Sequence, residues 1–298
     1  MRTPFRRSWV VGLAGLAVLV SAPAVAGASS GRSVSSAPVP KCGGQWLVKP
    51  SGGVWRCSFD DEFNGSALDT TKWVPQQTAL SGFHSGPECF VNSPSNISES
   101  GGTLNLTVRA TAAPFSCGGL YTTQYTSGSV SSYGLFAQAY GRFEVRAKLP
   151  AATVRGLQES FWLWPQNATR YGTTWPDSGE IDIAEAYSGY PGYAIPYVHY
   201  VAAAPDPHVT SYSCRITDPT AFHTYTAVWT TSTIAISYDG ATCLVDSWNP
   251  YGLTKPAPFD QPFMLALTQG LGIGTNAFDP SITPLPATTQ IDYVRVWK

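Results

Sequence analysis

The chain has 298 residues, of which 43% are hydrophobic and only 12% are charged, and its formal net charge at pH 7 is −1. Such a chain lacks the clustered positive charge that attracts nucleic acids or anionic membrane surfaces, so neither is an expected partner. The length allows one large domain or two small ones.

Residues 1–26 have the pattern of a secretory signal peptide. Arg2, Arg6 and Arg7 precede an apolar run from Trp9 to Val20, and a small-residue Ala-Val-Ala site follows. The run is too short to span a bilayer as a helix, which needs about 20 residues. Cleavage after residue 26 would remove three arginines and change the net charge from −1 to −4. We therefore expect a secreted, extracellular protein with no membrane contact after cleavage.

A leader and six cysteines come next. Residues 27–41 are rich in Ser, Gly, Ala and Pro, which predicts a flexible leader. An even number of cysteines in an exported protein indicates disulfide bonds. We expect neighbours along the chain to pair in order, as Cys42–Cys57, Cys89–Cys117 and Cys214–Cys243. No Cys-x-x-Cys spacing suggests a zinc site.

From residue 42 onward the pattern is that of short β-strands. Apolar and polar residues alternate in 104–109, 142–148 and 234–238, and no helical period persists. Asp239-Gly240 favours a hairpin turn, and 291–297 predicts a final strand. Together with 28 glycines and 24 prolines, these patterns favour an all-β, antiparallel sandwich. No repeat or change in composition divides residues 42–298, so we expect a single domain.

The segment 180–185 carries the carboxylates best suited to catalysis. Two isoleucines alternate with Glu180 and Asp182, which predicts a strand with one acidic face. Glu185, five positions after Glu180, would point to the other face of a regular strand. A one-residue β-bulge near 183–184 would return it to the face of Glu180. Because burying an acidic face is costly, we expect it to line a wet cleft.

Three carboxylates in one cleft suit glycoside hydrolysis. A retaining enzyme holds two carboxyl groups about 5–5.5 Å apart, one attacking the anomeric carbon and one acting as acid and then as base. Crowded like charges raise a pKa, so we expect Glu185 to be protonated as the acid while Glu180 stays ionised. Asp182, between them, would hydrogen-bond a glutamate.

The same segment, Glu-Ile-Asp-Ile-Ala-Glu, resembles the bulged E-x-D-x-x-E signature of glycoside hydrolase family 16, in its laminarinase-like subgroup. Segments similar to other strands of that family follow its order: 59–65, 125–128 with 140–150, 222–240, and 291–297. The resemblance implies a β-jelly-roll sandwich of two curved antiparallel sheets, as in concanavalin-like lectins, with a concave substrate cleft. It also implies that Glu180 is the nucleophile, Asp182 the assisting carboxylate and Glu185 the acid/base.

The resemblance implies no required cofactor, but it allows a structural calcium ion. Asp292 matches a position that, together with backbone carbonyls, helps to hold Ca²⁺ on the convex side of many relatives. A single carboxylate is little for a cation that prefers 6–8 oxygen ligands. The calcium expectation at Asp292 therefore depends on the resemblance alone.

Aromatic side chains crowd both ends of the acidic segment and are candidates for sugar binding. A tryptophan ring offers a large rigid face for a sugar, although a single Trp is more often a core residue. Trp175, in the loop before the acidic strand, is the first candidate, with Trp162 and Tyr187 beside it. His199 resembles a histidine on the following strand of bulged relatives. Arg142 is a nearby cation that would suit a sulfated glycan.

These observations predict an endo-acting retaining β-glycosidase, with endo-β-1,3-glucan hydrolysis first because the bulged subgroup makes it common. Residues 85–89, 158–160 and 268–270 depart from the family pattern at the subsites that select the sugar. A β-galactan hydrolase acting on agar or carrageenan therefore stays open as an alternative. So does a non-catalytic lectin, although a pure binder has no need of three carboxylates. We expect a monomer whose partner is its polysaccharide.

Overall fold

The structure, a computed structural model, describes residues 40–298. The expected signal peptide and all but the last two residues of the expected leader fall outside the described residues. Within the described part, helical structure is limited to the four-residue α1 (Thr78–Ser81) and the short 3-10 helix η1 (Gly274–Asn276). No helix among the described residues is long and apolar enough to cross a membrane.

All other regular elements are strands, in agreement with the alternating sequence. They are β1 (Leu47–Val48), β2 (Val54–Trp55), β3 (Cys57–Asp61), β4 (Val74–Pro75), β5 (Cys89–Phe90), β6 (Ile97–Ser100), β7 (Thr103–Cys117), β8 (Tyr121–Ser127), β9 (Ser129–Ser131), β10 (Gly141–Lys148), β11 (Leu157–Pro165), β12 (Glu180–Tyr187), β13 (Ala194–His199), β14 (His223–Trp229), β15 (Ile234–Tyr238), β16 (Ala241–Asp246), β17 (Phe263–Leu271) and β18 (Ala287–Trp297).

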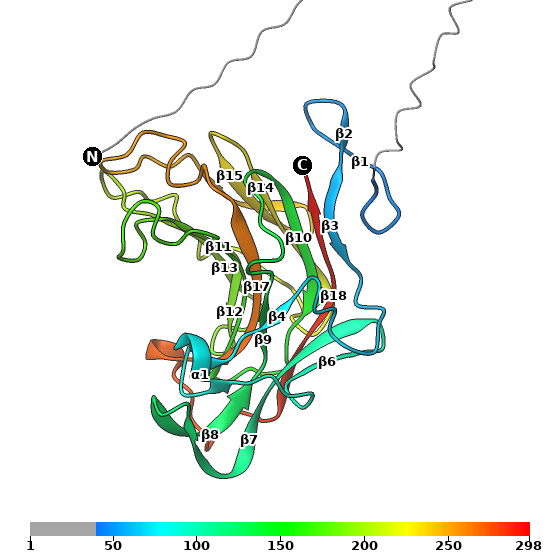
Figure 1. Cartoon of the computed structure of the whole chain (residues 1–298), viewed down its shortest axis with the longest axis vertical. Helices are drawn as coiled ribbons and strands as arrows, with labels where there is room; N and C mark the ends of the chain where they lie inside the picture. Colours follow the sequence, from blue (N-terminus) through cyan, green and yellow to red (C-terminus); the bar gives the residue numbers. More distant parts are fainter. Residues whose placement is uncertain (1–39) are drawn as a thin grey trace, which may run out of the picture. The chain divides into compact units, whose positions relative to one another are not determined.

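Two large sheets face each other (Figure 1). The first has six strands in the order β13-β12-β11-β17-β9-β4, and the second has ten, with the main path β16-β15-β14-β10-β18-β7-β8-β5. Strands β1 and β2 form a separate hairpin. All pairs are antiparallel except β5 with β8. The expected all-β sandwich is confirmed, and the acidic segment lies on β12, in the six-stranded sheet.

The core lies between the two sheets and follows from the period of two along each strand. On β10, Phe143 and Val145 point inward, and on β11 Phe161 and Leu163 do the same. Full burial of one such side chain stabilises the fold by about 1.5–3 kcal/mol. The alternate residues of the inner strands must then face outward, which is how β11 and β12 present polar side chains to the cleft.

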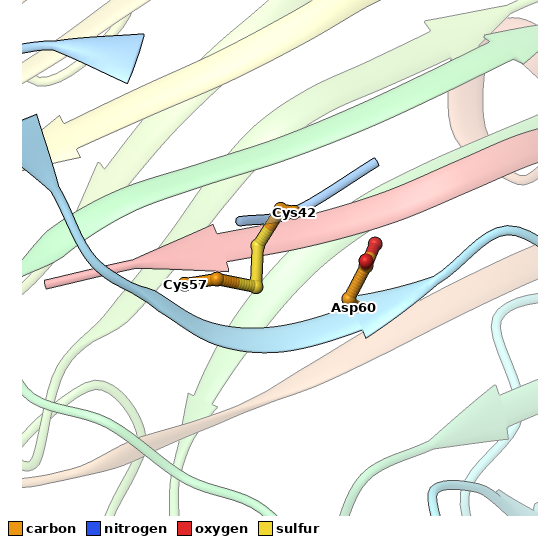
Figure 2. A group of neighbouring side chains, drawn as sticks. All are labelled: Cys42, Cys57 and Asp60. Atoms are coloured by element: carbon orange, nitrogen blue, oxygen red, sulfur yellow. A yellow bond between two sulfur atoms is a disulfide. The ribbon is translucent and has the colours of Figure 1, made fainter. Parts of the chain in front are cut away.

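Three disulfides join the cysteine pairs expected from the sequence, Cys42–Cys57, Cys89–Cys117 and Cys214–Cys243. Their Cα atoms are 5.1, 5.8 and 5.4 Å apart, and the closed loops span 15, 28 and 29 residues. Loops of this length correspond to about 3 kcal/mol or slightly more of stabilisation per bridge in the chain-entropy model. The first bridge lies beside Asp60 on β3 (Figure 2). Because both of its sulfurs are bonded to each other, this group is not a metal site.

Candidate active site

The strand β12 contains the expected bulge. In the pairing of β12 with β11, the β12 residues that have partners pass from Asp182 directly to Ala184. In the pairing of β12 with β13, they pass from Asp182 to Glu185. Ile183 therefore has no partner on either neighbouring strand. The bulge was predicted because Glu180 and Glu185 are five positions apart, whereas side chains on one face of a strand recur every two positions. The register confirms it.

The bulge separates apolar from acidic side chains along β12. The two isoleucines and the two alanines of this strand belong to the core between the sheets. Glu180, Asp182 and Glu185 lie outside that core, and after burial the charges of Asp182 and Glu185 also raise the pKa of Glu180. The three carboxyl groups are thus close enough to act as one cluster.

Glu180 is held by the loop that precedes its strand. The indole Nε1 of Trp175 donates a hydrogen bond of 2.6 Å to Glu180 Oε2. Burial and, next, the charge of Asp182 raise the pKa of Glu180 to about 8. Trp175 itself is 57% exposed, so its ring can meet a ligand while its N–H holds the carboxylate.

Asp182 is the most buried of the three carboxyl groups, at 4% exposure, and it contacts His199 on β13. His199 Nε2 lies 2.9 Å from Asp182 Oδ2. Burial and the charge of Glu185 raise the pKa of Asp182, whereas burial lowers the pKa of His199. One oxygen each of Glu180 and Asp182 and one ring nitrogen of His199 all lie within 4.8 Å of one another. Asp182 and His199 can therefore share a proton directly, and Glu180 is their immediate neighbour.

Glu185 receives a hydrogen bond on each carboxylate oxygen. Gln158 Nε2, on β11, donates to Oε1 and the Tyr187 hydroxyl donates to Oε2, both at 2.9 Å. Burial raises the pKa of Glu185, and these two bonds partly oppose it. Burial and the charge of Glu185 also raise the pKa of Tyr187, so its hydroxyl stays protonated and remains a donor. The two donors fix the orientation of the carboxyl group.

The protonation of Glu180 differs from the sequence-based expectation. The raised pKa of Glu185 agrees in direction with the expected protonated acid, whereas Glu180 was expected to be ionised and burial raises its pKa to about 8. The hydrogen bond from Trp175 lowers the pKa of Glu180 less than burial raises it. Near neutral pH the ligand-free cluster therefore retains protons that belong to the group as a whole.

Two cavities flank the cluster. One, of about 390 Å³, adjoins Glu180 and is lined by aromatic and apolar side chains of Phe83, Trp162, Trp164 and Met264. The other, of about 800 Å³, lies on the side of Glu185, where Gln158 contributes to its wall. Five tyrosines line this second cavity: Tyr187, Tyr190, Tyr193, Tyr197 and Tyr212.

The structure brings together four of the five predicted substrate-binding residues. Trp175, Tyr187 and His199 contact the carboxylates directly, and Trp162 lines the smaller cavity, where its Nε1 donates to the Thr268 hydroxyl at 3.1 Å. Gln158 and most of the tyrosines were not predicted from the sequence as ligand-binding residues. Strand alternation could have indicated Gln158, because it lies two positions before the β11 residue that pairs with Glu185 and therefore on the same face of that strand.

The prediction for Arg142 is wrong. Arg142 lies on β10, in the ten-stranded sheet, and forms an ion pair with Glu144. It alternates with Phe143 and Val145, which point into the core, so its own side chain points away from the space between the sheets. It cannot reach a ligand beside Glu180.

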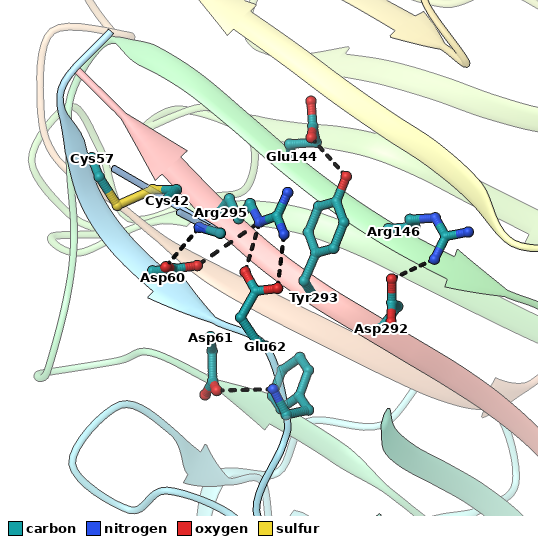
Figure 3. Close-up of polar contacts among 12 residues, drawn as sticks. Cys42, Cys57, Asp60, Asp61, Glu62, Glu144, Arg146, Asp292, Tyr293 and Arg295 are labelled. Carbon is teal, nitrogen blue, oxygen red and sulfur yellow. Dashed lines mark hydrogen bonds and ion pairs between the residues drawn. A yellow bond between two sulfur atoms is a disulfide. The ribbon is translucent and has the colours of Figure 1, made fainter. Parts of the chain in front are cut away.

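The surroundings of Asp292 do not fit a calcium ion. Its carboxylate forms an ion pair with the guanidinium of Arg146, from the neighbouring strand β10 (Figure 3). Calcium takes 6–8 oxygen ligands, and a bound cation would have to displace the guanidinium. Among the described residues, no group of three or more His, Cys, Asp or Glu side chains placed to hold a metal ion includes Asp292. The expectation of calcium at this carboxylate is therefore not supported.

Comparisons with known proteins agree with this geometry. A family model described as glycosyl hydrolases family 16 matches residues 88–269. Over 264 residues the chain is 33% identical to glucan endo-1,3-beta-glucosidase A1 of Niallia circulans, which covers 80% of this chain and 37% of that protein. Over 247 residues it is 32% identical to keratan-sulfate endo-1,4-beta-galactosidase of Sphingobacterium multivorum, which covers 80% of this chain and 54% of that protein. The chain thus spans only about a third to a half of these relatives.

Among solved structures, the laminarinase from Rhodothermus marinus is similar, with a TM-score of 0.70 and 29% sequence identity. The match covers 82% of this chain and 97% of that one. The likeness extends over nearly all of that enzyme, in contrast to the partial coverage of the two longer relatives.

Proposed function

Since the chain belongs to glycosyl hydrolase family 16, we propose that it is an endo-acting, retaining hydrolase of a β-1,3-glucan. The observation that carries the proposal is the bulged strand β12, whose three clustered carboxyl groups lie between two cavities. A cleft that continues on both sides of the cluster suits attack on an internal bond of a polysaccharide. The names of two similar proteins, a glucan endo-1,3-beta-glucosidase and a laminarinase, support β-1,3-glucan as the substrate.

In the first step, the carboxylate of Glu180 attacks the anomeric carbon and the bond from that carbon to the leaving oxygen breaks. Glu185 gives its proton to the leaving oxygen. Glu180 must be ionised to attack, so its proton has to pass to a neighbour when substrate binds. Asp182 and His199, whose polar atoms lie within 4.8 Å of an oxygen of Glu180, receive it directly or through one water.

In the second step, Glu185 takes a proton from water, the water oxygen bonds to the anomeric carbon, and the ester bond to Glu180 breaks. Gln158 and Tyr187 keep Glu185 in place for both proton transfers. In-line displacement puts the leaving group opposite the nucleophile. The tyrosine-lined cavity beside Glu185 therefore takes the leaving part of the chain, and the cavity of Trp162 takes the glycosyl part. This chemistry requires no cofactor.

The charge of Asp182 gives a test by pH dependence. The acidic limb of kcat/KM reports ionisation of the nucleophile in the free enzyme, so it should lie well above the ordinary carboxyl range in the wild type. Asp182→Asn removes a negative charge that raises the pKa of Glu180, so the acidic limb should move to lower pH, with kcat reduced about tenfold or more. Initial rates on laminarin between about pH 3 and pH 10 measure both the position of the acidic limb and kcat.

Asp177→Asn is the matched control, because Asp177 lies three positions before Glu180 but accepts a hydrogen bond from the Thr174 backbone instead. Its acidic limb should coincide with that of the wild type. A wild-type limb in the ordinary range, or an unchanged limb in Asp182→Asn, would refute the role given to this cluster.

A substrate panel tests the proposed function itself. We expect new reducing ends from laminarin, and fewer or none from agarose and galactan. The β-galactan alternative keeps a place in the panel because one relative is named as a keratan-sulfate endo-1,4-beta-galactosidase. Release from galactan or agarose alone would replace the glucan by that substrate. Binding to a glycan without release from any would indicate a lectin.

We further propose that residues 1–26 direct export, that the protein acts outside the cell as a monomer, and that residues 42–298 form its catalytic domain. Three disulfides support export, because such bonds persist in oxidising compartments. Mass spectrometry of the protein from culture medium would give the mature N-terminus.

A further inference from the structure

The bulge in β12 leaves its backbone without the usual support. Ile183 has no partner on β11 or β13. Two residues of β13 pair with Asp182 and Glu185, and Pro196 lies between them. Proline has no N–H to donate to the bulge. A bulge beside a proline has few ladder hydrogen bonds to hold its shape, so another group must stabilise it.

That group comes from the facing sheet. The hydroxyl of Tyr238, the last residue of β15, donates a hydrogen bond of 2.9 Å to the carbonyl oxygen of Ile183. The exposed fractions are 3% for Tyr238 and 0% for Ile183, so no solvent can replace this bond. A buried carbonyl without a donor is costly, and the tyrosine satisfies it across the core.

We propose that Tyr238 is a positioning residue, whose hydroxyl locks the bulge at Ile183 and thereby sets the position of Glu185 relative to Glu180. The proposal rests on the proposed function, in which these two glutamates act on the same bond. Tyr238 lies in the core between the sheets and lines neither of the two cavities beside the cluster. Its effect on the reaction passes through the backbone of β12, two residues before Glu185.

The chain offers a closely matched control in Tyr225. This residue on β14 pairs directly with Tyr238, and their rings are 5.2 Å apart. It is equally buried, but among the described residues its hydroxyl has no hydrogen-bond partner. Tyr238→Phe and Tyr225→Phe thus each remove one hydroxyl oxygen from the same layer of the core, and only the first removes a bond to the bulge.

The test compares both variants with the full-length wild type on laminarin, at a temperature where circular dichroism shows all three folded. A displacement of a catalytic group by about 1 Å can cost up to about 100-fold in rate. We expect Tyr238→Phe to lower kcat by about 10- to 100-fold with KM changed less than about twofold, and to shift the alkaline limb of the pH profile, which reports Glu185. Tyr225→Phe should stay within about twofold of the wild type in every parameter.

Hydrogen exchange followed by mass spectrometry gives a readout that does not depend on activity. Peptides from residues 180–187 should exchange faster in Tyr238→Phe and at the wild-type rate in Tyr225→Phe. Equal exchange in the two variants, or equal kinetics, would overturn the proposal. A wild type inactive on every glycan would overturn the proposed function instead, and the exchange comparison would then decide whether Tyr238 holds the bulge.

Discussion

Replacing Glu180 with alanine should lower kcat on laminarin by about 10⁴-fold or more, because no other carboxylate is placed to form the covalent bond to the sugar. Added azide can enter the vacant space and attack the anomeric carbon from the side that Glu180 occupied. The expected product is an α-glycosyl azide, inverted relative to the β-linked substrate. Chromatography and NMR of the azide adduct measure the outcome.

Glu185→Ala is the matched variant, because it removes a carboxylate of the same cluster with a different task. On laminarin it should also be slow, but on an aryl β-glycoside, whose phenolate leaves without protonation, the first step should proceed at a much higher rate. Azide should then rescue the second step and give a β-glycosyl azide, since Glu180 is still present to form the intermediate. Identical responses of the two variants to azide would mean that the roles of Glu180 and Glu185 are misassigned.

A second large effect is expected from Glu159, which lies on β11 with 3% exposure and does not take part in the reaction. Burial raises its pKa to about 8, and a 2.8 Å hydrogen bond from Gln269 Nε2 lowers it only in part. The folded protein therefore holds a proton on Glu159 that the unfolded chain loses near pH 4.5, the ordinary pKa of glutamate.

This difference makes stability depend on pH. Because the pKa is raised on folding, the stabilisation from protonated Glu159 is complete below about pH 4.5 and disappears as the pH rises towards 8. Each pKa unit corresponds to about 1.4 kcal/mol. Relative to low pH, ionisable Glu159 therefore lowers the free energy of unfolding by about 3–5 kcal/mol at pH 8. Glu159→Gln, which carries no charge, should therefore be more stable than the wild type at pH 8 by a similar amount. Urea unfolding at pH 5 and pH 8 (about the two ends of the window) with intact disulfides measures the free energy of unfolding.

Glu88→Gln provides a control of opposite sign. Glu88 is also fully buried, but its two oxygens accept hydrogen bonds from Ser85, Gly86 and Leu271. An amide NH₂ there would face donors, so this variant should be less stable than the wild type at both pH values. If Glu159→Gln lost stability as steeply as the wild type between pH 5 and pH 8, or if Glu88→Gln were stabilised, our account of these buried carboxyl groups would be wrong.

The sequence predicted the class of fold and the bulge of β12 because both depend on local periods. Alternation within a strand fixes which side chains share a face, and the departure between Glu180 and Glu185 is visible in six residues. Alternation does not say which sheet lies behind a strand, which is why Arg142 was assigned to the cleft although β10 belongs to the other sheet. The ion pair of Arg146 with Asp292 joins residues 146 positions apart, so no local pattern could indicate it.

The supporting residues of the site were also beyond local patterns. Tyr238 meets Ile183 from the other sheet across a sequence separation of 55, and the tyrosines of the larger cavity come from β12, β13 and two loops. The burial of Glu159 has a similar cause. By alternation Glu159 shares the inward face of β11 with Phe161 and Leu163, but alternation does not show that the second sheet covers a carboxyl group there almost completely. The protonation of the three carboxyl groups in the cleft depends on their own burial there, which the spacing of charges along β12 could not indicate.

The configuration of the first product tests the central claim, that Glu180 and Glu185 act as nucleophile and acid/base of a retaining hydrolase. Proton NMR recorded during the first minutes of laminarin hydrolysis, before mutarotation, distinguishes the new α and β reducing ends. Two displacements at one carbon predict that the β anomer forms first and the α anomer appears only later by mutarotation. Initial formation of the α anomer would mean a single displacement by water and would contradict the covalent role of Glu180.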